Sequence, residues 1–121
     1  MHFRPEQHLR RQDDFRRVRT QGRRIDRGVF TLWWRQREDA AAIPPAVVRV
    51  GVVASTAAVG PAVRRNAAKR RLREIFRRHQ ELVPPGTDLL LVARASLNRL
   101  QFAEAETKFI DTCQHIAGAK A

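Results

Sequence analysis

Basic side chains are concentrated in one segment of the sequence, RRNAAKRRLREIFRR at residues 64–78. Eight of its fifteen residues are Arg or Lys, and Glu74 is its single acid. A guanidinium group forks onto two phosphate oxygens, and cations that neutralise phosphates release the counterions of a nucleic acid. The chemistry that this segment indicates is binding of a polyanion, with nucleic acid as the first candidate and an anionic membrane surface as the second.

The spacing of these residues divides the segment into an apolar side and a basic side. Successive positions in an α-helix are separated by roughly 100°, which places Leu72, Ile75 and Phe76 together with Ala68 and His79. The apolar side would fix the helix to the domain, and the basic side would face outward as a rigid array of cations. The alternative, a solvated basic face without a partner, is disfavoured by the charge density. The predicted RNA-binding residues are Arg64, Arg65, Asn66, Lys69, Arg70, Arg71, Arg73 and Arg77.

The sequence contains no comparable group of residues for catalysis. Hydrolysis of a phosphodiester by two metal ions needs several convergent carboxylates, whereas the acidic residues here are scattered along the chain. The four histidines show no metal-ligand spacing, and the single Cys113 is typical of a small core residue. We therefore predict no catalytic residue, and no metal ion or cofactor bound by the protein alone.

The excess of positive charge is a property of the whole chain and not only of the basic segment. The 121 residues include 24 Lys and Arg against 12 Asp and Glu, a formal net charge of +12. The length suits one domain, so we predict a single RNA-binding domain over 1–121 with flexible ends at 1–8 and 117–121. No apolar run approaches the roughly 20 residues that span a bilayer, and the first residues lack the apolar core of a signal peptide. We expect a cytoplasmic protein with no membrane partner.

Local sequence signals predict the elements that hold the basic segment in place. Helices are predicted at 9–22, 59–80 and 96–116, the second with Gly60 as its N-cap and Pro61 in its first turn. Strands are predicted at 29–34, 47–55 and 87–95, with a loop at 35–46. This order indicates an α/β (α+β) two-layer sandwich, in which about three helices form one layer against a small mixed sheet.

The strand at 29–34, VFTLWW, has two different faces. Side chains alternate along a strand, so Phe30, Leu32 and Trp34 share the more apolar face, which should meet the core. Trp33 lies on the more polar face. Two interpretations of Trp33 stay open, because it could be buried under a helix or be presented to a ligand.

Six residues of the basic segment form a recognisable pattern. The spacing Arg-Asn-x-x-Lys-Arg-x-x-Arg-Glu resembles the signature of the bacterial ribonuclease P protein component. It is formed by Arg65, Asn66, Lys69, Arg70, Arg73 and Glu74. The segments DDFRRVRTQG, RVGVVAS and TDLLLVAR are similar to the family's first helix and to the strands on either side of its signature helix. The chain departs from many relatives at Ala67, Thr56 and Ala57, where they carry basic residues.

The resemblance implies both a fold and a function. The implied fold is an α/β sandwich in which a left-handed βαβ crossover holds the signature helix. The implied function is that of a non-catalytic subunit, which binds a large catalytic RNA and requires no protein partner. The ribonucleoprotein removes the 5′ leader of precursor tRNA by hydrolysis, and Mg²⁺ is bound with the RNA subunit.

The resemblance also implies a cleft for the leader. An aromatic ring at the position of Trp33 lies in that cleft beside Phe15 of the first helix, and the expected cationic neighbours are Arg16, Arg19 and Arg49. The alternative function is a general RNA-binding or ribosome-associated protein that uses the same helix without processing activity. A DNA-binding domain is disfavoured, because a Val-rich strand precedes the basic helix in place of a second helix.

Overall fold

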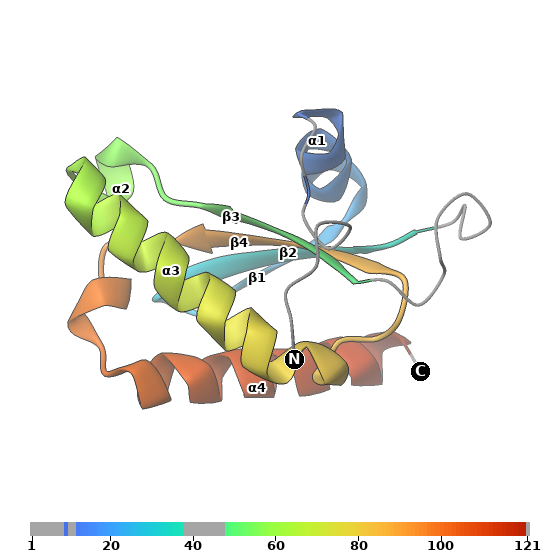
Figure 1. The fold of residues 1–121 in the computed structure, drawn as a ribbon. Coiled ribbons are helices and arrows are strands. Elements are labelled where there is room, and N and C mark those ends of the chain that lie inside the picture. The colour runs from blue at the N-terminus through green and yellow to red at the C-terminus, as the bar shows by residue number, and fades with distance from the viewer. Residues whose placement is uncertain (1–8, 10–11, 38–47, 121) are drawn as a thin grey trace.

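A four-stranded mixed sheet forms the centre of the fold (Figure 1). The structure, a computed structural model, describes residues 9, 12–37 and 48–120. The strands are β1 (Arg23–Asp26), β2 (Phe30–Gln36), β3 (Arg49–Val53) and β4 (Thr87–Ala93), and their order in the sheet is β1-β2-β4-β3. β2 pairs antiparallel with both β1 and β4, whereas β3 and β4 are parallel neighbours.

Helices cover both faces of this sheet. α3 (Ala62–His79) and α4 (Phe102–Lys120) lie on one face, and α1 (Gln12–Gln21) lies on the other (Figure 1). The predicted α+β class is confirmed, but α1 forms a separate layer from the other two helices. The parallel crossover is also present, because the chain leaves β3, passes through α3 and returns in β4.

The main core lies between the sheet and the pair α3 and α4. Phe30, Leu32 and Trp34 of β2 point into it, as the alternation in the sequence predicts. The apolar side of α3 meets them with Ala68, Leu72, Ile75 and Phe76, each at most 1% exposed. Phe109 and Cys113 of α4 are also completely buried.

A smaller core lies on the opposite face, under α1. Its buried residues are Leu9, Val18 and Leu90. Phe15 and Trp33 are partly buried and pack against them. Trp33 is therefore partly buried under α1 and keeps an exposed part, and its presentation to a ligand stays a prediction.

Two elements, β1 and α2 (Thr56–Val59), were not predicted from the sequence. β1 reads RRID and exposes most of its side chains, so its conformation depends on pairing with β2 and not on an apolar pattern. α2 is one short turn, and the Ser55 hydroxyl caps it by accepting a hydrogen bond from the Ala58 amide at 3.1 Å. This turn occupies the segment between the Val-rich strand and the basic helix.

The extra turn explains one wrong prediction at the start of α3. Gly60 serves as the C-cap of α2 at φ +104, and Pro61 is the N-cap of α3. The prediction of Gly60 as the N-cap of the basic helix is therefore wrong by one residue. Leu9 also lies outside its predicted helix, because its amide donates to the Val50 carbonyl at 3.0 Å and α1 begins at Gln12.

The boundaries of several other elements also differ from the prediction, and β3 is shorter than the predicted 47–55. β2 continues to Gln36 because Arg35 and Gln36 pair with the first residues of β4, so the start of the predicted loop at 35–46 is strand. Residues 38–46 of that loop lie outside the described residues. The last helix begins only after the 3₁₀ turn η4 (Leu97–Arg99), and it extends to Lys120. A second 3₁₀ turn, η3 (Gln80–Leu82), follows α3. Flexible ends stay a prediction, and 1–8 lie outside the described part of the chain.

Replacement of Leu72 tests whether α3 is held by its apolar side. Leu72 is 1% exposed, so Leu72→Ala should leave a cavity and lower the free energy of unfolding by about 2–5 kcal/mol. Arg73→Ala is the matched control at the next residue, because its side chain is exposed and its loss should change stability by no more than about 0.5 kcal/mol. Urea denaturation measures both, and equal losses would contradict docking through Leu72.

Candidate nucleic-acid interface

The outward side of α3 forms a groove of about 750 Å³. Its lining residues recur every three or four positions along the helix, so they form one continuous stripe, which we call the α3 groove. They are Asn66, Lys69, Arg70, Arg73, Glu74 and Arg77. All except Glu74 belong to the predicted RNA-binding set, and the structure brings these five together.

The charges in the α3 groove differ in how far they are neutralised. Arg77 donates from Nε and Nη2 to the two carboxylate oxygens of Glu74, both at 2.7 Å. Arg78 adds a longer contact to Glu74 at 3.4 Å. Lys69, Arg70 and Arg73 form no ion pair with any described residue. The free protein thus presents three uncompensated cations in the groove beside one closed ion pair.

The hydrogen bonds from Arg77 change the acidity of Glu74. They are the largest cause that lowers the pKa of this carboxyl, from 4.5 to about 2, with attraction to Arg77 and a hydrogen bond from Arg78 acting in the same direction. Glu74 is therefore ionised at every physiological pH, and it offsets the charge of Arg77 on the surface of the helix.

Three predicted residues lie outside the groove. Arg71 donates from Nη1 to the carbonyls of Leu97 and Leu100, at 3.2 and 2.7 Å, so it fastens the η4 turn to α3. Arg65 is half-buried and Arg64 is exposed near the start of the helix. The sequence could not separate Arg71 from the groove residues, because its position on the helix borders the basic side and its partners are backbone atoms distant in the chain.

The predicted leader residues Phe15 and Trp33 lie together on the α1 face of the sheet. The Phe15 ring rests directly on Gly51, where an added Cβ would lie 2.5 Å from a ring carbon. The Arg24 guanidinium lies 5.9 Å from the centroid of the Trp33 ring. Gly51 is thus needed for the close approach of α1, and both rings keep an exposed part.

The three predicted cationic neighbours have different surroundings. Arg16 and Arg19 are exposed on α1, and Arg16 lies 4.0 Å from Asp13. Arg49 is held at the sheet, because its Nε and Nη2 donate to the carboxylate of Asp88 at 2.9 and 2.7 Å. Its Nη1 lies 3.7 Å from Asp14 of α1. The side chain of Arg49 is consequently part of an ionic cluster that joins α1 to the sheet.

Asp88 is the centre of this cluster and was not singled out from the sequence. It is 1% exposed and accepts a third hydrogen bond from Nη1 of Arg37, at 2.6 Å. Arg37 itself is 4% exposed. The sequence did contain a signal for this cluster, because Asp88 is a charged residue at the start of the apolar run TDLLLVA. A carboxylate buried with such a strand requires cationic partners.

Residues suited to metal binding or nucleophilic chemistry are not assembled in the described part of the chain. No group of three or more His, Cys, Asp or Glu residues there could hold a metal ion. His79 contacts Glu106 at 2.8 Å, and burial raises the pKa of the Cys113 thiol to about 12. Within the same residues, no helix has the length and apolar character needed to cross a membrane.

Comparison with known sequences decides the family. The sequence model of the Ribonuclease P family matches residues 3–117. The chain belongs to the ribonuclease P protein family. It is accordingly a protein subunit of this ribonucleoprotein endoribonuclease, whose family role is RNA binding and processing of precursor tRNA. Membership also decides against the general RNA-binding protein that the sequence left open.

Individual relatives agree with this assignment. The ribonuclease P protein component of Syntrophobacter fumaroxidans is 32% identical over 117 residues, which cover 96% of this chain and 92% of the relative. That of Oleidesulfovibrio alaskensis is 40% identical over 90 residues, covering 74% and 68%. The solved RNase P protein of Thermotoga maritima has a TM-score of 0.76 at 27% identity, covering 90% of this chain and 96% of that one. The Staphylococcus aureus protein, at 22% identity and a TM-score of 0.74, shares the fold over 92% of this chain and 94% of its own.

The ion pair in the α3 groove should be visible in a titration. A carboxyl whose pKa is lowered by folding stabilises the fold fully above pH 4.5, its pKa in the unfolded chain. This contribution is lost as the pH falls toward about 2, its pKa in the folded protein. Titration of the Glu74 carboxyl carbon by NMR should therefore give a midpoint near 2, and Arg77→Gln should move it toward the ordinary range. Arg73→Gln removes the same charge without a contact to Glu74 and should leave the midpoint nearly unchanged. A wild-type midpoint in the ordinary range would contradict the pairing.

Proposed function

We propose that the α3 groove binds the catalytic RNA subunit of ribonuclease P through its phosphates. The observation that carries this proposal is the set of uncompensated cations, Lys69, Arg70 and Arg73, in one groove of a docked helix. Their spacing is fixed by helix geometry, so they can neutralise neighbouring phosphates without reordering of the backbone. Counterion release then supplies a salt-dependent driving force that does not depend on base sequence.

We further propose that the α1 face holds the 5′ leader of precursor tRNA. A precursor differs from mature tRNA by this single-stranded extension, and single strands bind where aromatic rings line a basic groove. Phe15 and Trp33 supply two partly exposed rings on one face, and Arg24 lies over one of them. Arg16 and Arg19 add exposed cations along α1.

These two contacts define the separate roles of the protein and the RNA subunit. The protein supplies RNA binding, and the hydrolysis with its Mg²⁺ ions is assigned to the RNA subunit. The family role supports this assignment, as does the scatter of carboxylates, which gives the described residues no group to bind a pair of metal ions. We expect the protein to act in the cytoplasm, where precursor tRNA is available.

The salt dependence of binding tests the α3 groove. Each phosphate contact contributes roughly 0.7–0.9 to the slope of log K against log salt. The double variant Arg70→Ala/Arg73→Ala should therefore bind the catalytic RNA with a slope lower by about 1.4–1.8 units, as measured by filter binding. Lys108→Ala on α4 is the control and should leave the slope unchanged. An unchanged slope in the double variant, with its fold intact by circular dichroism, would place the RNA elsewhere.

Precursor and mature tRNA should respond differently to changes on the α1 face. Phe15→Leu and Trp33→Leu keep apolar bulk but remove the stacking surface, which is worth about 1–3 kcal/mol per base. Each should weaken binding of leader-bearing tRNA to the reconstituted holoenzyme by about 5- to 160-fold, while mature tRNA and the catalytic RNA bind as before.

Phe102→Leu is the matched control for these variants. Its ring is also half-buried beneath an arginine, with Arg78 4.9 Å from the ring centroid, but it lies on α4 on the other face of the sheet. Equal losses for precursor and mature tRNA in the α1-face variants would show that Phe15 and Trp33 act only as packing residues.

A further inference from the structure

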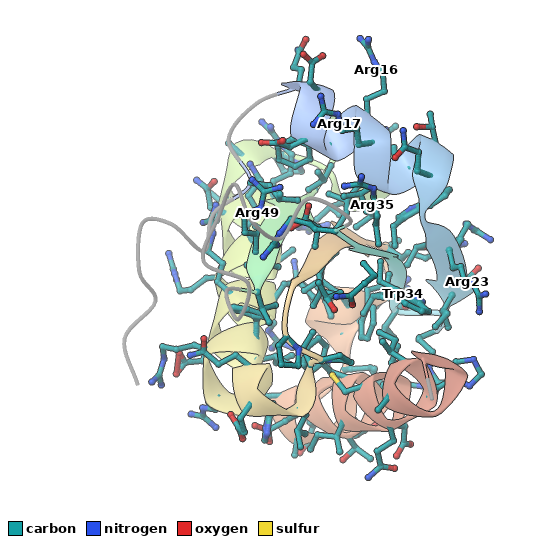
Figure 2. All side chains as sticks on the ribbon, turned by 90° about the vertical axis from the view of Figure 1, so that its right-hand side faces the viewer. Arg16, Arg17, Arg23, Trp34, Arg35 and Arg49 are labelled. Atoms are coloured by element: carbon teal, nitrogen blue, oxygen red, sulfur yellow. The ribbon has the colours of Figure 1, made fainter. Side chains whose placement is uncertain are left out.

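A second group of arginines lies at the end of the sheet where β2 ends (Figure 2). It consists of Arg17 of α1, Arg23 of β1 and Arg35 of β2, and we call it the second basic surface. In Figure 2 these three side chains occupy the upper and right-hand part of the molecule, whereas α3 runs along the left-hand side. The group is therefore separate from the α3 groove.

Close packing fixes the elements that carry this surface. Gly22 joins α1 to β1, and an added Cβ there would lie 2.3 Å from the Val18 carbonyl oxygen and 2.5 Å from that of Trp34. Arg35 donates from Nε to the side-chain oxygen of Gln21 at 3.0 Å, which ties β2 to the last residue of α1. Backbone and side-chain contacts thus hold the end of α1 against β2. The backbone that carries these arginines is therefore fixed in position.

The charge of the second basic surface is largely uncompensated. Arg17, Arg23 and Arg35 form no ion pair with any described residue. Arg16 of the proposed leader site is the neighbouring cation on α1, and its only ion pair with a described residue is an exposed contact at 4.0 Å from Asp13, a kind of pair that contributes little. Arg49 lies nearby in Figure 2, but Asp88 and Asp14 already neutralise its cluster. Several like charges held together in this way favour a polyanionic partner.

The surroundings of Trp34 indicate which form of RNA fits. Its ring is 7% exposed, and the Arg23 guanidinium lies 5.6 Å from its centroid. The ring beside Arg23 is therefore not open for a base to stack on, unlike the rings of a site for single strands. Guanidinium groups without base contacts bind the phosphate backbone of structured RNA.

We infer that the second basic surface binds the backbone of a segment of the catalytic RNA other than the segment in the α3 groove. The catalytic RNA is the structured partner that membership of the family supplies. Because the two surfaces lie on different sides of the domain, the protein would be held between two segments of one RNA. This inference does not depend on the α3 groove, since none of its residues lies on α3.

The triple variant Arg17→Gln/Arg23→Gln/Arg35→Gln tests the inference. At roughly 0.7–0.9 per contact, it should lower the salt slope of binding to the catalytic RNA by about two to three units. The loss should add to that of Arg70→Ala/Arg73→Ala, because distant sites contribute independently. Lys108→Gln is the single-charge control. An unchanged slope in the triple variant would overturn the inference, and so would a loss seen only for mature tRNA bound to the holoenzyme.

Directed cleavage shows whether two RNA segments are involved. The natural Cys113 is buried and its pKa is raised to about 12, so a probe reacts selectively with a new surface cysteine. Iron–EDTA attached in Arg17→Cys and in Arg70→Cys should cut the catalytic RNA at two separate places in the assembled holoenzyme. Cleavage at one shared place, or no cleavage of this RNA from position 17, would contradict the inference.

Discussion

The packing of α3 against the sheet is the interaction on which the other features of the molecule depend. Leu72, Ile75 and Phe76 are buried against β2, β3 and β4, and burial of each such side chain contributes about 1.5–3 kcal/mol. This contact fixes the rotation of the helix about its own axis. Without it, the cations of α3 would repel one another on a mobile segment, whereas with it they line one groove in a fixed order.

Arginine performs two different tasks in this protein, and the surroundings of each side chain separate them. Arg37 and Arg49 bind the buried carboxylate of Asp88, and removing one partner of a buried ion pair costs about 3–5 kcal/mol. Arg71 similarly bonds two backbone carbonyls of the η4 turn. These residues stabilise the fold, so the cations available to RNA are fewer than the composition suggests. Among those that form no ion pair with a described residue are Lys69, Arg70 and Arg73 of the α3 groove.

The parts of the fold that the sequence predicts are those with a strong local pattern. The buried side of α3 and the alternation of β2 follow from helix and strand periodicity, and both are confirmed. β1 was missed because its sequence is polar and its strand conformation depends on β2. Asp88 was missed for a related reason, and so was the structural role of Arg71, which was predicted to bind RNA. Their partners lie 26–51 residues away in the chain, and no local pattern records such contacts. Within the candidate site, local periodicity could therefore predict which residues point outward, but not which outward arginines are already bound.

The distribution of charge also links RNA binding to stability. A net charge of +12 on 121 residues opposes compaction of the free chain, and like charges within the α3 groove each cost a few tenths of a kcal/mol. A partner that binds only the folded state adds about 2.7 kcal/mol at a hundred times its Kd. Phosphates would neutralise the repelling groups while leaving the Asp88 cluster and the Leu72 contact unchanged. The same arginines that weaken the free domain would then strengthen the bound one, because the scaffold that holds them relies on burial and on acidic partners that RNA does not displace.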